Sequence, residues 1–368
     1  MPDSFSEFDE IRKEPADPEV EVIPPNEIMR EILKSNVLLD SLYAIPPLLL
    51  NLSAYGKKDS CSYLGYKGNI IPVVIRRTLG IYVLAQHSPP QIAVQCEGAS
   101  RIDIVENIKV LRRAFPALLV KLRQYPFDDA YLQSSANWVR EPRTDKLDIQ
   151  IDLTNPVEVI YSRMTRDQRN RLRKALNLSD EGVISSNAES LPSCVRDETS
   201  FDGAEKFGHL LGRTLGKISS HGDERESEGF IQSYEREYAL LRRSFSTLRD
   251  YGLVKVFIAY DERGDPGSGA VLLVSGKFIR SPMALWWQGG STPEGNRRGL
   301  SVALQWAVIT WLIRNGYYRY YMGGIEPEGN GRGPTYFKRS FGGQEVSGHV
   351  LWYSPLPFLS ELVGRRGT

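Results

Sequence analysis

The sequence predicts an α/β (α+β) protein made of two domains in tandem, each a mixed β-sheet flanked by helices. One observation is length: 368 residues exceed what one compact hydrophobic core usually organises. A second is that one order of elements, strand–strand–strand–helix–strand, occurs twice along the chain. Since the two copies share no repeat at residue level, we expect a shared topology rather than a shared sequence.

The first domain is expected over residues 28–160, after an acidic tail over residues 1–27. The tail holds nine acidic residues, two basic residues and five prolines. Such a segment cannot bury enough apolar surface to offset the entropy of ordering it, so we expect it to be disordered. An alternative is an acidic mimic that blocks a basic groove of the same chain.

The elements of the first domain follow from apolar spacing. A short helix is expected over Glu27–Leu42. The turn Lys67-Gly68-Asn69 lies between two strand-like runs and predicts a hairpin. The expected elements after the first helix are the strands Ser62–Tyr66, Ile70–Arg76 and Gly80–Gln86, a helix over Ile102–Phe115 and a strand over Ala117–Leu122.

The second domain is expected over residues 161–368 and repeats this order. Its helix, Gly299–Asn315, ends at an Asn-Gly pair, which is typical of a helix C-cap. The segment "LSVALQWAVITWLI" within this helix is apolar on almost every face, so we expect the helix to be buried. The expected strands are Leu253–Tyr260, Ala270–Val274, Phe278–Gln288 and Tyr317–Met322, with a turn at Asp261–Gly269.

Two segments are candidate anion sites. Arg297, Arg298 and Gly299 precede the buried helix, where backbone N–H groups and the positive helix end could hold an anion; alternatively, the arginines are solvated and the glycines only form the turn. The second segment, Ser162–Leu176, holds six cations against one acid. We expect Arg166, Arg169 and Arg173 on one helical face, followed by Lys174, which suits a phosphate backbone. The alternative is a solvated helix paired with Asp180 and Glu181.

Composition excludes several classes of protein. The net charge of +1 gives no molecule-wide affinity for nucleic acid or membranes, and we expect no DNA partner. Three scattered cysteines and four distant histidines provide neither a disulfide framework nor metal-ligand spacing, so no metal is expected. No signal peptide or membrane-spanning segment is readable, so we expect a cytoplasmic protein.

The segment "GNGRGPTYFKRSFGGQEV" (Gly329–Val346) combines a glycine-rich loop with two phenylalanines. We expect the glycines to give a mobile loop over a site. Phe337 and Phe341 would then anchor the following strand in the core and hold Lys338 and Arg339 on a rigid element.

These C-terminal motifs resemble those of FemAB-type aminoacyltransferases, members of the GNAT acetyltransferase superfamily with two GNAT-like domains. "YRYYMGGI" (Tyr318–Ile325) followed by "YFKRSFGGQEV" (Tyr336–Val346) is similar to the family's Gly-Gly-Ile strand end, Phe-Lys and Phe-Gly-Gly. "RNRLRKA" (Arg169–Ala175) and "WAVITWLIRNG" (Trp306–Gly316) resemble its basic helix and its buried helix. The resemblance covers roughly residues 40–358.

The resemblance implies site residues. Phe337 and Lys338 would lie at the reaction centre, where Lys338 would stabilise the oxyanion or the leaving hydroxyl. Tyr321 is a positional candidate for the base, as is His349. Gly342 and Gly343 would let the backbone approach the substrate closely, and Gly324 and Arg339 would lie beside it.

The implied function is amide formation by transfer of an aminoacyl group to an amine of a peptidoglycan precursor or peptide. The implied donor is aminoacyl-tRNA, with acyl-CoA as the alternative, and no tightly bound cofactor is expected. The family's acid before Gly-Gly is here replaced by Tyr321 and Met322. The acetyltransferase pyrophosphate loop is matched in Asn296–Ser301 only at Gly299. The alternative from a different functional class is a non-catalytic module that binds RNA or another polyanion.

Overall fold

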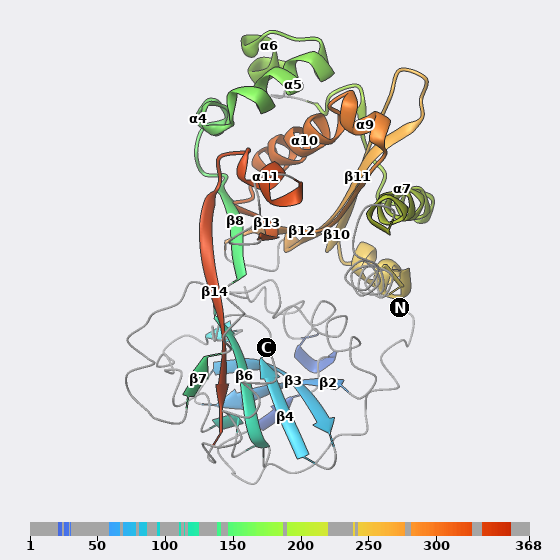
Figure 1. Ribbon diagram of the computed structural model, residues 1–368. Coiled ribbons are helices and arrows are strands. Elements are labelled where there is room, and N and C mark those ends of the chain that lie inside the picture. Colours follow the sequence, from blue (N-terminus) through green and yellow to red (C-terminus); the bar gives the residue numbers. More distant parts are fainter. Residues whose placement is uncertain are drawn as a thin grey trace. The chain divides into compact units, whose positions relative to one another are not determined.

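The computed structural model (Figure 1) divides into two compact units. The first unit holds the chain up to Leu147 and from Val346 onward, and the second holds most of Asp148–Glu345. The division therefore precedes the residue, 160, at which the sequence analysis placed it. The structure describes residues 21–23, 26–28, 30, 59–66, 69–78, 81–86, 94–95, 110–111, 114, 117–124, 138–140, 146–186, 190–219, 238–239, 242–276, 281–325 and 333–354.

The first unit contains a mixed sheet with the strand order β1-β2-β3-β4-β6-β14. The strands β2 and β3 are antiparallel with Tyr66 opposite Asn69, which confirms the predicted hairpin. The strands β3 and β4 are also antiparallel, whereas β4 and β6 are parallel. The strand bounds are β1 Glu21–Ile23, β2 Asp59–Tyr66, β3 Asn69–Thr78, β4 Ile81–Gln86, β6 Ala117–Gln124 and β14 Gln344–Tyr353, with β5 Val94–Gln95 on β3 and β7 Trp138–Arg140 on β14.

The described residues begin inside the range predicted as a disordered tail. Residues 21–23 form β1, which pairs with β2, and Ile28 is buried. Val22 and Ile23 are β-branched and favour a strand despite their acidic neighbours, so the prediction for residues 1–27 is wrong at its C-terminal end. Residues 1–20 and most of the predicted helix Glu27–Leu42 lie outside the described residues. Of the predicted helix Ile102–Phe115, residues 110, 111 and 114 are described, and they are helical.

The second unit repeats the strand pattern of the first. The strands β10 and β11 are antiparallel, β11 and β12 are antiparallel, and β12 and β13 are parallel. This is the pairing of β2, β3, β4 and β6, so the predicted tandem of two mixed sheets is confirmed. The order is β8-β13-β12-β11-β10-β9, with β8 Lys146–Asp152, β9 Val195–Asp197, β10 Val254–Tyr260, β11 Pro266–Val274, β12 Met283–Ser291 and β13 Arg319–Ile325.

Helices α7 (Phe201–Ser219) and α10 (Leu300–Arg314) cover opposite faces of this sheet. Ser268 and Gly269 are neighbours in β11 and therefore point to opposite faces. The Ser268 hydroxyl bonds that of Ser301 in α10, whereas a Cβ on Gly269 would contact Leu210 and Phe207 of α7. Eleven of the fifteen residues of α10 are buried, as its all-round apolar sequence predicts.

The remaining described helices include two corrections to the sequence analysis. The basic segment Ser162–Leu176 is not one helix: α4 ends before Met164, and Thr165 caps α5 by accepting the N–H of Gln168. The rigid element expected around Lys338, before the following strand, is a short helix that the sequence analysis did not predict. The bounds are α4 Val157–Arg163, α5 Arg166–Leu176, α6 Asp180–Ser186, α9 Pro293–Arg297 and α11 Pro334–Arg339, and residues 242–250 are also helical. Within the described part of the chain, no helix is long and apolar enough to cross a bilayer.

Candidate functional site

The candidate site lies where the parallel strands β12 and β13 separate. Their pairing is confined to Met283–Leu285 against Arg319–Tyr321, although both strands continue further. The next residue of β12, Trp286, contacts Phe337 of α11 edge to face, with ring centroids 5.9 Å apart. Helix α11 therefore packs against β12 just beyond the end of the pairing.

Lys338 extends from α11 to the end of β13. Its Nζ donates to the carbonyl oxygen of Gly324 over 2.7 Å, and it lies 3.5 Å from the point that a Cβ on Gly323 would occupy. Gly323 has φ +79°, a conformation that favours glycine, so the chain can bend at this point. The predicted residues Lys338 and Gly324 are thus in direct contact.

Asp148 of β8 is the acidic group of this site. A Cβ on Gly324 would lie 3.6 Å from Asp148 Oδ1, so the carboxylate and the Lys338 ammonium both lie close to Gly324. Burial lowers the pKa of Lys338, and the negative charge of Asp148 opposes that shift. Lysine, glycine carbonyl and carboxylate come from three elements, α11, β13 and β8.

Phe337 and Tyr321 complete this group of predicted residues. Phe337 packs between Trp286 and Phe341, and the two phenylalanine centroids are 5.1 Å apart. Phe341 is fully buried, so it anchors α11 in the core, as predicted for the element that carries Lys338. Tyr321 is half-buried in the last residue pair of β12 and β13, opposite Leu285.

Gly342 and Gly343 contact the chain's own backbone. Gly342 has φ +72°, and a Cβ there would lie 2.3 Å from the carbonyl oxygen of Arg163. A Cβ on Gly343 would lie 2.5 Å from Ile149 Cγ2. Close packing of the turn after α11 on α4 and β8 accounts for both glycines. Arg339 forms an ion pair with Glu345 over 2.7 Å.

The arginines of the basic segment bind groups within that segment. Arg169 donates to the carbonyl oxygens of Ser162 and Met164 over 2.8 and 2.9 Å and so closes the end of α4. Arg173 pairs with Asp180 over 3.3 Å, as the alternative reading expected. Lys174 is exposed. Both guanidinium groups thus have partners within the protein, and the role of Arg169 and Arg173 in binding an anion stays a prediction.

The start of α10 is packed against α5. A Cβ on Gly299 would lie 3.1 Å from the carbonyl oxygen of Arg171 and 3.2 Å from Ala175 Cβ. The guanidinium of Arg171 also donates to the Asn296 carbonyl oxygen over 2.9 Å. The protein thus fills one side of the predicted anion site at Gly299. Arg297 and Arg298 both bind the carboxylate of Glu294, which lowers its pKa.

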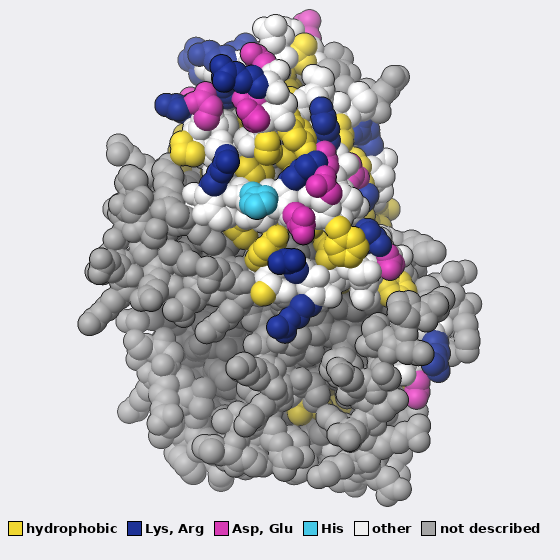
Figure 2. Space-filling view, turned by 90° about the vertical axis from the view of Figure 1, so that its right-hand side faces the viewer, with side chains coloured by type: hydrophobic (Ala, Val, Ile, Leu, Met, Phe, Trp, Pro, Cys, Tyr) yellow, Lys and Arg dark blue, Asp and Glu magenta, His cyan; other side chains and the backbone are white. Residues whose placement is uncertain are grey.

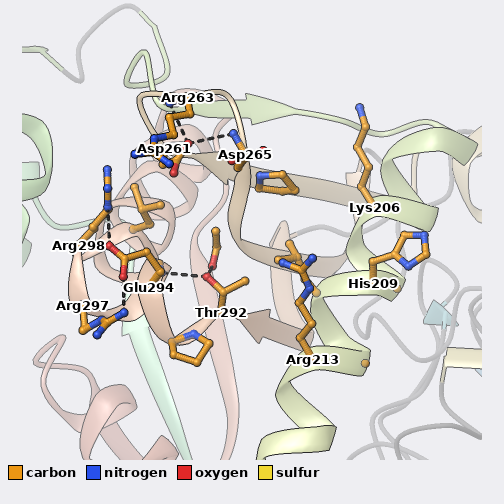
Figure 3. A pocket seen from close by; sticks show the side chains of 18 residues that line it. Lys206, His209, Arg213, Asp261, Arg263, Asp265, Thr292, Glu294, Arg297 and Arg298 are labelled. Carbon is orange, nitrogen blue, oxygen red and sulfur yellow. Dashed lines mark hydrogen bonds and ion pairs between the residues drawn. The ribbon is translucent and has the colours of Figure 1, made fainter.

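Arg297 and Arg298 also line a cleft of about 1220 Å³ between α7, the turn Asp261–Asp265 and α9 (Figure 3). Neither Lys338 nor Phe337 borders it. The basic residues that α7 and the turn contribute to this cleft were not predicted from the sequence. Asp148 and Trp286 were also not identified, although the alternating "KLDIQID" and the paired tryptophans of "LWWQ" mark both as strand residues. Among the described residues, no three His, Cys, Asp or Glu side chains gather as a metal site.

Comparisons with known proteins agree with this architecture. Residues 166–339 match the model of the acetyltransferase (GNAT) domain. The crystal structure of FemX superposes with a TM-score of 0.52 at 13% identity, over 94% of this chain and 100% of that one. L-PGS from Bacillus licheniformis gives a TM-score of 0.50 at 13% identity, over 94% and 97% of the two chains. No curated protein matches the chain significantly.

A structure of a conserved protein of unknown function from Bacteroides thetaiotaomicron is also similar, with a TM-score of 0.54 at 8% identity over 90% and 96% of the two chains. At such identities these likenesses concern the fold. The chain carries an acetyltransferase (GNAT) domain in its second unit and has the fold of FemX, as its resemblance to FemAB-like members of the GNAT superfamily predicts.

Proposed function

We propose that this protein is an N-acyltransferase that forms an amide bond on an amine acceptor at the Lys338 site. The observation that carries the proposal is the half-buried Lys338 ammonium, which lies against the Gly324 carbonyl where β12 and β13 separate. A cation on a short helix anchored by Phe341 is held in place before the substrate arrives. Such a preorganised charge suits a reaction that develops an oxyanion.

The reaction needs little else from the protein. Attack of an amine on an ester or thioester produces a tetrahedral oxyanion, and the ammonium of Lys338 would stabilise that charge in a partly desolvated site. Collapse of this intermediate breaks the C–O or C–S bond and releases the donor as a free hydroxyl or thiol, which takes up the proton lost by the amine. Positioning of donor and acceptor supplies a further large part of the rate. The attacking amine must also lose a proton, and the carboxylate of Asp148 is the acidic side chain placed near Lys338.

For the donor, we favour aminoacyl-tRNA over acyl-CoA. Gly299 is the one residue that matches the acetyltransferase pyrophosphate loop, and α5 packs directly against it. This packing leaves less space beside Gly299 for the pyrophosphate of acyl-CoA. Arg166 and Lys174 remain exposed on α5, where they could contact a phosphate backbone. The match to an acetyltransferase domain favours acyl-CoA as the second candidate. The acceptor we propose, from the FemAB resemblance, is an amine of a cell-wall precursor or peptide.

The decisive experiment compares wild type with Lys338→Met in two assays. Transfer to an amine acceptor is measured with a charged bulk tRNA pool and, separately, with acetyl-CoA. Donor binding is measured by filter binding over a salt series. We expect Lys338→Met to bind the donor and to lose transfer by about 100-fold or more, as for removal of an oxyanion-stabilising group. Transfer by Lys338→Met at the wild-type rate would refute the proposal. Salt-dependent RNA binding without any transfer by wild type would favour the non-catalytic module.

A further inference from the structure

The cleft of the second unit lies apart from the Lys338 site. Its lining begins at Thr292, directly after β12 and six residues after Trp286, which corresponds to about 20 Å of extended chain. Its volume of about 1220 Å³ is of the order of known small-molecule sites, which span about 300–1,000 Å³. The cleft is therefore large enough for a ligand of its own.

Gly267 and Gly295, which line the cleft, form a floor where α9 meets the start of β11. A Cβ on Gly295 would lie 2.1 Å from the carbonyl oxygen of Gly267, so α9 and the start of β11 approach as closely as two glycines permit. Gly212 of α7 faces open space. Helix α7 is fixed beside this floor because the Ser291 N–H donates to Thr214 Oγ1 over 2.8 Å. The side chain of Arg213, next to Thr214, is therefore carried on an anchored helix.

Most of the charged groups of the cleft are already neutralised by neighbours. Glu294 is shared by Arg297 and Arg298, which leaves this trio with one excess positive charge. Asp261 accepts the N–H groups of Arg263 and Asp265, and these hydrogen bonds lower its pKa together with nearby arginine charges. Lys206 is held by Asp202 and Glu198.

The cationic side chains of the cleft that remain are Arg213 and Arg263. Both are exposed, both line the cleft, and within the described part of the chain neither forms an ion pair. In Figure 3 the Arg213 side chain extends from α7 into the space beside Thr292, while Arg263 lies at the turn with Asp261 and Asp265. The surrounding surface in Figure 2 mixes basic and acidic side chains, so a cationic surface patch alone does not define this site.

We propose that this cleft binds a phosphate group, with Arg213 and Arg263 as its ligands from two sides and the Arg297–Arg298 pair adding positive potential. Guanidinium groups match phosphate oxygens in geometry and bind them by charge-assisted hydrogen bonds. The glycine floor admits the attached group close to the backbone. Asp265, which also lines the cleft, opposes binding by its charge. The inference concerns binding alone and does not depend on the reaction proposed for Lys338.

The test is isothermal titration of the full chain at low salt with three probes: pyrophosphate, AMP and a short single-stranded RNA. We expect binding of at least one probe, weakened about 3- to 10-fold by Arg213→Gln and by Arg263→Gln. Asp265→Asn should strengthen binding, because it removes a negative charge. Arg319→Gln, an exposed arginine of β13 outside the cleft, is the matched control and should leave binding unchanged.

The probes distinguish the source of the phosphate. Binding of AMP and pyrophosphate identifies a small phosphorylated ligand. Binding of RNA alone, with a salt slope that falls by about one for each arginine removed, identifies a polynucleotide backbone. Absence of binding by all three probes would overturn the proposal. So would equal affinities of the wild type and both arginine variants.

Discussion

Lys338 is held between two opposing electrostatic effects. Burial disfavours its charged form and lowers its pKa, while the carboxylate of Asp148 favours the charged form. The protonated side chain is the form that could stabilise an oxyanion. Activity that depends on it is therefore present below the lowered pKa and is lost as the pH rises through that value.

The first prediction concerns this pH dependence. Asp148→Asn removes the charge that raises the pKa of Lys338, so the alkaline decline of kcat/KM should move to lower pH. Lys338→Arg should move the decline to higher pH, because a guanidinium stays protonated. The measurement is a pH profile of transfer by the three proteins. Asp152→Asn, in the same strand, is the control for a change of charge.

An Asp148→Asn profile that coincides with the wild-type profile would contradict this assignment. The shift also has a consequence for stability. The unfolded chain binds more protons than the folded one between the lowered and the ordinary lysine pKa, so folding stability rises with pH in that window. Lys338→Met should lack this rise, which denaturant titrations at several pH values can measure.

The second prediction compares two glycines. Gly342→Ala should destabilise the protein by about 2 kcal/mol or more, because φ is +72° and a Cβ would overlap the carbonyl oxygen of Arg163. Gly212→Ala is the matched control: it lies in α7 with open space around its Cβ position, and it should stabilise by up to about 1 kcal/mol. Urea unfolding gives both values. Similar stabilities of the two variants would show that the turn after α11 shifts to accommodate the new Cβ at residue 342 without loss of stability.

At the scale of elements, one arginine of α5, Arg169, links that helix to the end of α4 by hydrogen bonds. The third prediction is that Arg169→Ala destabilises the protein by about 1–3 kcal/mol, because two carbonyl groups at the end of α4 lose their donor. Lys174→Ala, on the exposed side of α5, should change stability by less than about 0.5 kcal/mol. Thermal unfolding tests the pair. Equal and negligible changes in stability would mean that the hydrogen bonds from Arg169 to the end of α4 do not stabilise the protein.

The same pair of variants separates structure from RNA binding. If α5 contacts RNA, Lys174→Ala and Arg166→Gln should weaken filter binding and reduce its salt slope by about one each. The Arg169→Ala variant should leave the salt slope of RNA binding unchanged at temperatures at which the variant is folded. A large loss of salt slope in Arg169→Ala alone would support the predicted contact of the α5 arginine face with RNA.

Much of the element order could be predicted from sequence, and two errors had readable signals. Apolar strands bounded by turn residues identified the hairpin at Asn69 and the strands of the second unit. The break before α5 is marked by Thr165 and Gln168, a capping-box spacing. Helix α11 begins with Pro334 at its first position, and Phe337 and Phe341 have helical spacing. The sequence analysis nevertheless assigned no helix here and expected the two phenylalanines only to anchor a following strand.

The contacts that build the site were not readable. Gly324, Asp148 and Lys338 come together only because β13, β8 and α11 are placed by tertiary packing. The same holds for Arg171, which reaches Asn296 across 125 positions of sequence. A pattern of spacing identifies residues that share an element, whereas the partner of a side chain on another element depends on the whole fold. The motif resemblance indicated Lys338 but not its acidic neighbour.

At the scale of the whole molecule, the first unit completes its sheet with a strand from the far end of the chain. β14 follows the second unit in sequence and pairs with β6 of the first, from His349–Gln124 to Tyr353–Val120. β8, which comes before the helices of the second unit, lies next to β13. The first unit therefore cannot complete its sheet until the C-terminal strand has been made.

The last prediction tests this dependence by truncation. A chain ending at Glu345 lacks nearly all of β14, so β6 becomes an edge strand with unpaired backbone groups. We expect the amides of β6 that face β14 to lose protection in hydrogen exchange and the truncated chain to aggregate more readily. A chain ending at Ser354 retains β14 and is the control. If the β6 amides stay protected in the shorter chain, then the sheet of the first unit is stable without β14. The C-terminal strand would then not be needed for the stability of that sheet.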